Sequence, residues 1–380
     1  MAHPQKWETM RAMDRIVKRI LGLVAVLCAA PATAYAQDAG PDARLWDATL
    51  AKAKTQTLVM VNQGGPGFDK TIEAFTKKFG IKVDATVARP TVILPRVKTE
   101  QANGQYLWDM WWATTSNMTG SAAPAGMLQK FDDFLILPEV KDIANWRHPN
   151  YIYGDAGHMV FTHAHEVTAS AYRNLDVVPE VNTDTIDGLL DPRLKGKVIV
   201  RDASQTNAGS SALAPLYKVK GAAFVTRFLT EQEPRVLDNP QQIDSTIMRG
   251  GVAVAFGMQF FAYAGCVKDG GCKNVKPIPH LAAVSSRGFS IFRNAPNPEA
   301  TKIFVNWVLS KEGQELFVRE WAAGNDSGAV SMRKDVEPHP LHKQDLPDFT
   351  RANDYVWVHT DEGAKEVDAV VKIFKETVGK

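Results

Sequence analysis

The stretch Lys195-Gly-Lys-Val-Ile-Val-Arg-Asp-Ala-Ser-Gln-Thr-Asn-Ala-Gly-Ser-Ser211 joins an apolar run to a polar segment. Its residues 198–200 are all β-branched and apolar, which predicts a short buried strand. The apolar pattern resumes at residues 212–214, where we expect a helix. A helix that begins just after a buried strand has several backbone N–H groups without intrahelical partners, and such groups can bind an anion.

Two interpretations of this segment remain open. In the first, Ser204 or Thr206 is simply the N-cap of the helix. In the second, the segment also forms a cradle for an anion, with Ser204, Thr206, Gly209 and Ser210 as its contacts.

The composition is that of a folded globular protein. Of the 380 residues, 45% are hydrophobic and 23% are charged, and the formal net charge is +2. This charge is too small, and too evenly spread, to predict a nucleic-acid partner.

The N-terminus has the three parts of a secretory signal peptide. Three basic residues in the range 15–19 precede the apolar run Ile20–Ala30, and Ala34-Tyr-Ala36 follows as a small-residue cleavage site. We therefore expect residues 1–36 to be removed and the mature chain to be periplasmic. The alternative is an N-terminal amphipathic helix. Cleavage leaves 39 basic and 40 acidic residues, so the mature chain is close to neutral.

Two cysteines, Cys266 and Cys272, remain in the mature chain. In an oxidising compartment two cysteines at this spacing predict a disulfide that closes a short loop. A metal-binding pair is the alternative, although the sequence has no second pair to complete such a site.

The first half of the mature chain alternates between strand and helix patterns. Residues 57–61, 81–87 and 108–113 read as strands, with helical periodicity between them. This order predicts an α/β fold with mostly parallel sheets flanked by helices. Ligands bind beyond the carboxyl ends of such strands. Candidate contacts there are Gly64, Gly65, Thr115 and Ser116.

A second β/α series begins near residue 167 and has no low-complexity linker before it. We therefore expect two lobes that face each other across a cleft. The expected N-terminal lobe comprises residues 41–165 and 285–330, and the expected C-terminal lobe comprises residues 166–284 and 331–380.

Three segments resemble a known family: Asp191-Pro-Arg-Leu-Lys-Gly-Lys-Val198, Arg249-Gly-Gly-Val-Ala-Val-Ala255, and Asn297-Pro-Glu-Ala300 with Ser310-Lys-Glu-Gly-Gln314. The chain resembles the periplasmic solute-binding proteins of ABC importers, in the group that contains the ferric-ion-binding proteins. The resemblance implies a two-lobed, hinge-closing receptor that binds a small-molecule solute between its lobes and delivers it to an inner-membrane ABC permease. We further expect a monomer without a cofactor and without enzymatic activity.

The residues expected to bind iron differ from the family pattern. Gln259 and Phe260 stand where the ferric-ion-binding proteins have a tyrosine pair, and the loops with Gly64-Gly65 and Thr114–Ser116 lack the family's His and Glu. Ferric iron requires anionic oxygen ligands. The polar helix start that binds the accompanying anion in the family is retained at residues 204–211. We therefore predict a small organic anion: a phosphate ester, a phosphonate or a carboxylate.

Further candidates complete the predicted site. Gln259 follows a predicted strand, and Arg89 and Arg287 stand at strand-to-loop transitions, where they supply a guanidinium fork or else form surface ion pairs. Trp111, Trp112 and Phe260 either line the cleft or belong to the core.

Two other functions remain open because of His163-Ala-His165. In an extended segment His163 and His165 share a face and form a weak candidate site for iron or zinc. The same pair is the basis of a second alternative, a periplasmic hydrolase. The sequence contains no Gly-x-Ser-x-Gly, Walker or His-Glu-x-x-His motif to support an enzyme.

Overall fold

The computed structural model describes residues 41–148, 152–169, 171–324, 329–339 and 347–379. The expected signal peptide, residues 1–36, lies outside the described residues. The described chain begins with helix α2 (Pro41–Ala53). None of the helices in this part of the chain combines the length and the apolar character of a membrane span.

The first sheet contains eight strands of the described chain, in the order β12-β5-β11-β3-β1-β2, while β4 and β13 pair with β11. Strand β1 is parallel to β2 and β3, as the β-α-β-α-β pattern predicts. The sheet as a whole is mixed rather than mostly parallel, because β11 enters antiparallel between β3 and β5. The strands are β1 (Thr57–Asn62), β2 (Lys82–Val87), β3 (Met110–Thr114), β4 (Leu128–Gln129), β5 (Val160–Ala169), β11 (Ala282–Phe292), β12 (Val330–Ser331) and β13 (Val356–Trp357).

The second sheet has the order β10-β6-β9-β7-β8. The apolar run predicted at residues 198–200 is its strand β7, which is parallel to β8 and β9. Strand β6 is antiparallel to β9 and β10, so this sheet is mixed as well. The strands are β6 (Ala171–Asn174), β7 (Val198–Arg201), β8 (Arg235–Leu237), β9 (Val254–Phe256) and β10 (Val275–Pro277).

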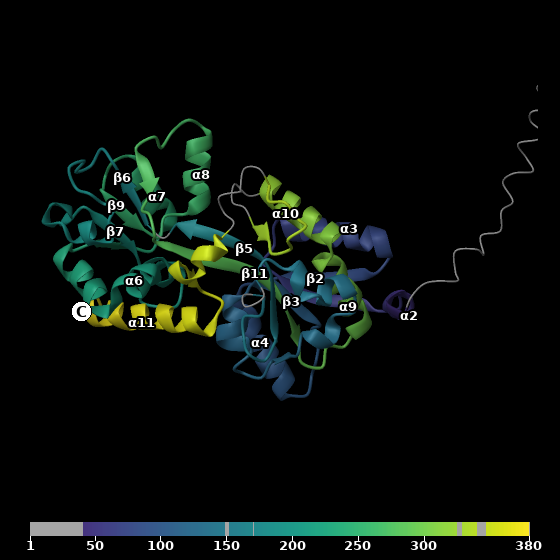
Figure 1. The fold of residues 1–380 in the computed structure, drawn as a ribbon. Coiled ribbons are helices and arrows are strands. Elements are labelled where there is room, and N and C mark those ends of the chain that lie inside the picture. The colour runs from purple at the N-terminus through teal and green to yellow at the C-terminus, as the bar shows by residue number, and fades with distance from the viewer. Residues whose placement is uncertain (1–40, 149–151, 170, 325–328, 340–346, 380) are drawn as a thin grey trace, which may run out of the picture. The chain divides into compact units, whose positions relative to one another are not determined.

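Two long strands, β5 and β11, connect the sheets (Figure 1). They pair antiparallel from Ala169↔Ala282 to Val160↔Ser290, with an irregularity between Arg287 and Gly288. The chain leaves β5 for β6 of the second sheet and returns from β10 through β11. The α/β class and the two-lobed architecture expected from the sequence are therefore confirmed, and the expected lobe boundaries at residues 165–166 and 284–285 fall within these strands.

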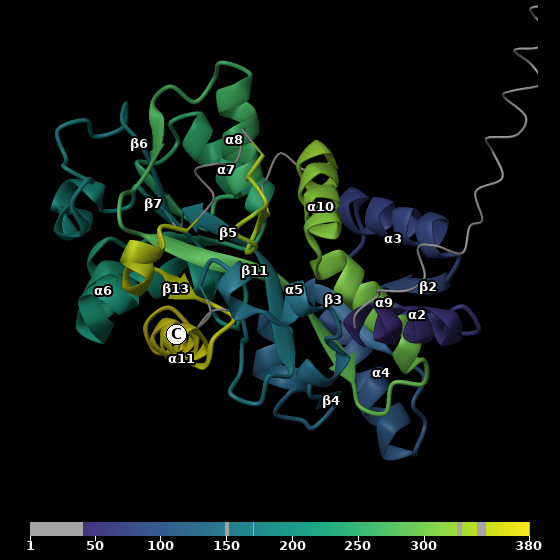
Figure 2. The same ribbon diagram turned by 45° about the vertical axis from the view of Figure 1, so that its right-hand side comes forward.

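Helices cover both faces of the first sheet (Figure 2). Trp111 and Trp112, adjacent in β3, point to opposite faces because side chains alternate along a strand. Trp112 packs against Phe68 and Phe317 of the helices on one face, and Trp111 belongs to a separate cluster with Ile93 of the helix on the other. Both tryptophans are therefore core residues. The helices are α3 (Pro66–Phe79), α4 (Pro90–Ala102), α5 (Pro138–Lys141), α9 (Pro298–Leu309) and α10 (Lys311–Gly324).

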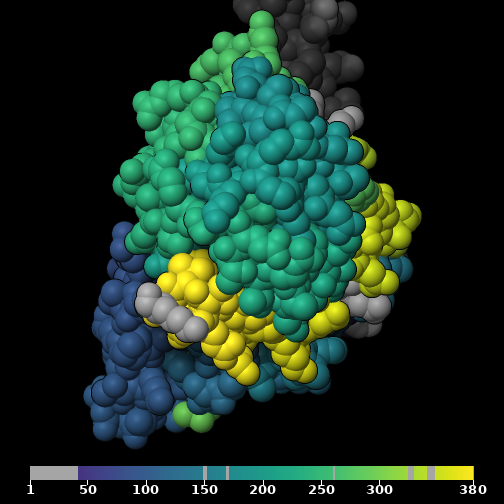
Figure 3. All heavy atoms as spheres, turned by 90° about the vertical axis from the view of Figure 1, so that its left-hand side faces the viewer, coloured from purple at the N-terminus to yellow at the C-terminus, as the bar shows by residue number. Residues whose placement is uncertain are grey.

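The second sheet packs against α6 (Ala208–Glu231), α7 (Pro240–Met248), α8 (Phe260–Lys268) and the C-terminal α11 (Asp361–Thr377). The apolar face of α11 is buried against the same core as α6, through Val367, Val370 and Phe374. In Figure 3 the yellow C-terminal residues lie between the blue residues of the first lobe and the green residues of the second.

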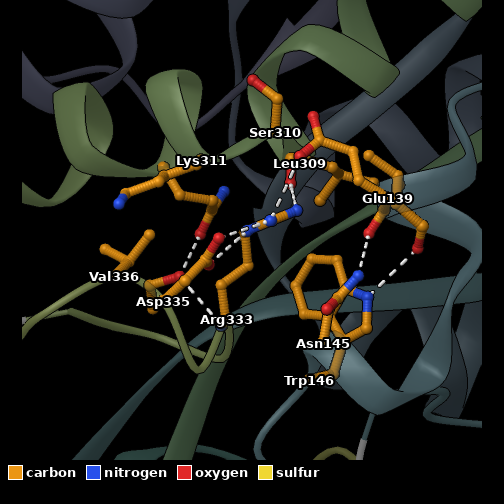
Figure 4. A network of polar contacts seen from close by, with 12 residues as sticks. Glu139, Asn145, Trp146, Leu309, Ser310, Lys311, Arg333, Asp335 and Val336 are labelled. Carbon is orange, nitrogen blue, oxygen red and sulfur yellow. Dashed lines mark hydrogen bonds and ion pairs between the residues drawn. The ribbon is translucent and has the colours of Figure 1, made fainter.

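A buried arginine holds the segment after α10 against the first lobe (Figure 4). The Arg333 guanidinium makes two hydrogen bonds of 2.8 Å to Asp335 and donates to the Leu309 carbonyl at 3.1 Å. It also lies 3.3 Å from Glu139. The side chain is only 2% exposed, so its charge requires these partners.

Candidate ligand-binding cleft

A cavity of ≈ 1030 Å³ lies beyond the carboxyl ends of β1, β3, β7 and β9. This is the position at which ligands bind in α/β sheets. Both sheets and their helices contribute to its wall. The polar and aromatic residues on the first-sheet side include Gln63, Thr114, Ser116, Asn117, Glu166, Arg287 and Trp321, and those contributed with the second sheet include Arg201, Gln205, Thr206, Asn207, Ser211, Gln259 and Asp368.

Arg287 is a positive charge in this wall whose side chain is largely buried. Its side chain is 12% exposed, and its Nη2 donates to Glu166 at 3.3 Å. Its Nε and Nη1 are buried and have no hydrogen-bond partner among the described residues. Burial lowers the pKa of the guanidinium, and the Glu166 carboxylate opposes this effect. An arginine remains charged at neutral pH despite such a shift, so the cleft contains a cation with unused donors.

Trp321 holds the Arg287 guanidinium in place. The guanidinium carbon lies 4.4 Å from the centroid of the indole ring, a cation–π distance. The indole packs edge-on against Phe68, and Gly67 makes this approach possible. A Cβ at Gly67 would lie only 2.8 Å from Trp321 Cε3.

Arg201, at the end of β7, brings a second guanidinium to the cleft from the other sheet. Its Nε is buried without a partner in the described part of the chain. Gly257 packs directly against it, since a Cβ there would lie 2.7 Å from Arg201 Cβ. The neighbouring Asp244 accepts a 2.9 Å hydrogen bond from the Gln259 backbone N–H and so holds Gln259 at the cleft. Burial raises the pKa of Asp244, and Arg201 opposes this effect.

The helix start that we expected to form an anion cradle is largely occupied by its own cap. Asn207 is the N-cap of α6, so the expectation of Ser204 or Thr206 in that role is wrong. Its Oδ1 accepts from the N–H groups of Gly209 (2.7 Å) and Ser210 (3.2 Å), and the Ser210 hydroxyl accepts from the Asn207 N–H at 2.9 Å. Residues 202–207 form the turn from β7 into α6. Within this turn the Asp202 carboxylate accepts a hydrogen bond from the Ser204 N–H.

The cavity brings together four of the predicted contacts: Ser116, Thr206, Gln259 and Arg287. Seven others do not line it: Gly64, Gly65, Arg89, Thr115, Ser204, Gly209 and Ser210. Gly64 and Gly65 adopt positive φ values of 75° and 107° in the turn before α3, and the adjacent Gln63 faces the cleft instead. Thr115 is fully buried beneath the wall, and Arg89 is exposed. The Phe260 side chain lies outside the described part of the chain.

Sequence reasoning missed Arg201, Glu166 and Trp321. Arg201 directly follows the predicted strand 198–200, so the rule that ligands bind beyond strand ends could have identified it. Trp321 comes from α10, and only the tertiary fold brings it to the cleft.

His163 and His165 lie in β5 and are fully buried outside the cavity wall. His163 Nε2 accepts from the Trp112 indole at 2.9 Å, and burial lowers the His163 pKa to about 3. His165 Nδ1 lies 2.8 Å from the Ser286 hydroxyl, and burial lowers its pKa as well. Within the described residues, no three His, Cys, Asp or Glu side chains are grouped to hold a metal ion.

Cys266 and Cys272 form a disulfide, as the sequence predicts. It closes the loop at the C-terminal end of α8, whose N-terminal end begins next to Gln259. Neither cysteine is a residue of the cavity wall.

The chain belongs to the family of bacterial extracellular solute-binding proteins, whose family model matches residues 70–350. It is therefore an extracytoplasmic binding protein of the kind that serves ABC importers, as the sequence resemblance implies.

Individual relatives are distant. A Haemophilus influenzae protein described as uncharacterized is 26% identical over 305 residues, which cover 76% of this chain and 82% of the relative. A Trichodesmium protein (IdiA, FutA) solved with iron and citrate ligands is 18% identical with a TM-score of 0.63, covering 86% of this chain and 100% of the other. An Actinobacillus pleuropneumoniae periplasmic binding protein (AfuA) solved with fructose-6-phosphate is 17% identical with a TM-score of 0.56, covering 85% and 98%. These structural likenesses establish the fold and leave the solute open.

Proposed function

We propose that this protein is a monomeric periplasmic receptor that captures a small organic anion and delivers it to an ABC permease. The solute is a phosphate ester, a phosphonate or a carboxylate. Arg287 from the first sheet and Arg201 from the second hold its anionic group, and Ser116, Thr206 and Gln259 contact its other polar atoms.

The observation that carries this proposal is that two arginines of one cavity have buried N–H donors without partners among the described residues. Arg287 has two buried N–H donors without partners among the described residues, and Arg201 has one. An unsatisfied buried donor costs about 1–3 kcal/mol, and more when the group is charged. An oxyanion removes this cost, because guanidinium groups match the geometry of carboxylates and phosphates.

The chemistry of the cleft favours such an anion over a directly bound metal ion. The cleft carboxylates are Glu166, which pairs with Arg287, and Asp368, which accepts a hydrogen bond from Thr206 at 3.3 Å. A hard cation would need several such oxygens converging on one point. The anionic ligands of two proteins with the same fold, citrate and fructose-6-phosphate, are consistent with the proposal.

Closure of the cleft follows from the position of the two arginines. Because they belong to different sheets, an anion that bridges them draws the lobes together. The strands β5 and β11, within which the expected lobe boundaries fall, would act as the hinge. The proposed lobes are residues 41–165 with 285–330 and residues 166–284 with 331–380, after removal of the signal peptide 1–36, except that the segment around Arg333 stays with the first lobe, to which it is hydrogen-bonded.

The proposal is tested with the mature protein and a library of phosphate esters, phosphonates and carboxylates. A ligand that binds only the native state raises the melting temperature. We expect Arg287→Met and Arg201→Met each to weaken the best hit by about tenfold or more, which corresponds to about 1.4 kcal/mol. Arg89→Met removes an exposed arginine outside the cavity wall and is the matched control.

Two results would contradict the proposal. One is an affinity that the Arg287 and Arg201 variants leave unchanged. The other is mass spectrometry of the protein as purified that detects near-stoichiometric iron or zinc without an organic ligand. Small-angle scattering supplies a separate check, since the ligand should make the molecule more compact.

A further inference from the structure

Any bidentate contact of the Arg287 guanidinium with an oxyanion would involve its Nη2 atom. A guanidinium grips an oxyanion with two parallel N–H groups, either Nε with Nη2 or Nη1 with Nη2. Both arrangements include Nη2, each through a different one of its two N–H groups. In Arg287 this is the nitrogen that donates to Glu166 at 3.3 Å, while Nε and Nη1 have no partner among the described residues.

Glu166 is fixed beside this nitrogen by the two strands that connect the sheets. It lies in β5 opposite Ser285 of β11, and Arg287 lies opposite Ala164, so the two residues are diagonal neighbours on paired strands. Glu166 lines the cavity together with Arg287, and its side chain is 8% exposed. Its negative charge therefore lies beside the donors that an anionic solute at Arg287 would use.

The contact is poorly suited to a purely structural ion pair. A charge-assisted hydrogen bond is typically about 2.7–2.9 Å long, as in the 2.7 Å pair of Lys218 with Glu366 elsewhere in this protein. The Glu166 contact is longer and uses only one of the donors of Arg287. A stronger, bidentate partner can therefore replace it.

We infer that the Glu166 carboxylate competes with the solute for Arg287. It is paired with Arg287 in the ligand-free receptor and is displaced when the anionic solute binds. This inference rests on the proposed function, because it assumes that the solute binds Arg287. Glu166 thereby acts as a specificity-determining residue: it repels weak oxyanions such as inorganic phosphate and admits solutes whose remaining contacts in the cleft compensate for its displacement.

The test measures the affinity of the mature protein for inorganic phosphate by calorimetry and by thermal shift. Glu166→Gln keeps the size of the side chain and removes its charge, so we expect phosphate to bind at least about tenfold more tightly than to the parent. The gain should disappear in the double variant Glu166→Gln/Arg287→Met. Glu366→Gln is the matched control, since it makes the same change in a buried ion pair outside this cavity and should show no gain.

Several outcomes would overturn the inference. The inference is overturned if Glu166→Gln binds phosphate no more tightly than the parent protein. It is also overturned if neither protein binds phosphate. If Glu166→Gln fails to fold, Glu166→Ala replaces it, and failure of both variants shows that the carboxylate is structural. If Arg287→Met loses affinity for a library ligand but Glu166→Gln gains no affinity for phosphate, the competition by Glu166 is refuted and the proposed function stands. An Arg287→Met variant that binds every anion like the parent refutes the proposed function as well.

Discussion

Replacing His163 with glutamine should flatten the dependence of the free energy of unfolding on pH. His163 is fully buried, and its Nε2 accepts a hydrogen bond from the Trp112 indole N–H at 2.9 Å. The indole nitrogen can only donate, so a proton on Nε2 would break this bond. Burial is the main cause that lowers the His163 pKa, and the positive charge of Arg287 contributes, while the contact with Gln314 opposes them.

The magnitude follows from the difference between the folded and unfolded pKa values. The pKa of His163 falls from its ordinary value of 6.5 to about 3 in the folded protein. Between these values the unfolded chain binds the proton and the folded chain does not, so the folded state loses stability as the pH falls. One pKa unit corresponds to about 1.4 kcal/mol, which gives a loss of about 2 kcal/mol from His163 between pH 7 and pH 5.

Urea unfolding of the mature protein at both pH values measures this loss. The parent should lose about 2 kcal/mol more than His163→Gln does between them. Any cost of the substitution itself cancels, because each protein is compared with itself. His280→Asn changes an exposed histidine and should reproduce the slope of the parent. An equal loss in His163→Gln and in the parent would show that His163 is protonated in the folded state or that the fold has opened around it.

Two further predictions concern packing. In Gly67→Ala the new Cβ would lie 2.8 Å from Trp321 Cε3 and 3.2 Å from its Cα. We therefore expect the free energy of unfolding, measured in urea, to fall by about 1–3 kcal/mol and the best anionic ligand to bind more weakly. Gly120→Ala, where a Cβ meets nothing within 4 Å, is the stability control, and equal stabilities of the two variants would contradict the reasoning. Arg333→Leu leaves the Leu309 carbonyl buried without its donor, while Asp335 and Glu139 can turn to solvent. We therefore expect the free energy of unfolding to fall by about 2–4 kcal/mol. Arg193→Leu breaks the exposed pair with Asp191 and should change stability little, so comparable losses in the two variants would refute the stabilising role of the Arg333 contacts.

Local sequence patterns were sufficient to predict the first three strands and their parallel order. The apolar runs at residues 57–61 and 198–200 and the helices between strands follow from hydrophobic periodicity alone. The antiparallel insertion of β11 did not follow from the sequence. Its eleven residues include three serines and a glycine in a mixed pattern, and its pairing with β5 joins segments more than a hundred residues apart. Such long-range pairing depends on the packing of the whole domain.

The candidate site was predictable only where it is built from strand ends. Ser116 and Gln259 lie in the loops that follow β3 and β9, and both line the cavity. The prediction for Gly209 and Ser210 identified a real feature, the helix start, but side-chain geometry at Asn207 determined which donors remain available there. The support of Arg287 by Trp321 requires α10 to pack against α3, which no local pattern indicates.

The stretch Lys195–Ser211 explains why the proposed site relies on arginines. A neutral cap such as Asn207 satisfies the first N–H groups of α6 in the absence of any ligand, so the folded state does not depend on a bound anion there. Gln259 and Phe260 stand where the resemblance to the ferric-ion-binding proteins places a tyrosine pair, and the proposed function assigns no metal ion to the cleft. Positive charge must then come from side chains, and Arg201 stands within this same stretch, at the end of β7. Two partly buried guanidinium groups that face one cleft would be costly without counter-charges. Asp244 beside Arg201 and Glu166 beside Arg287 supply these counter-charges, and of the two only Glu166 lines the cavity, where an anion can displace it.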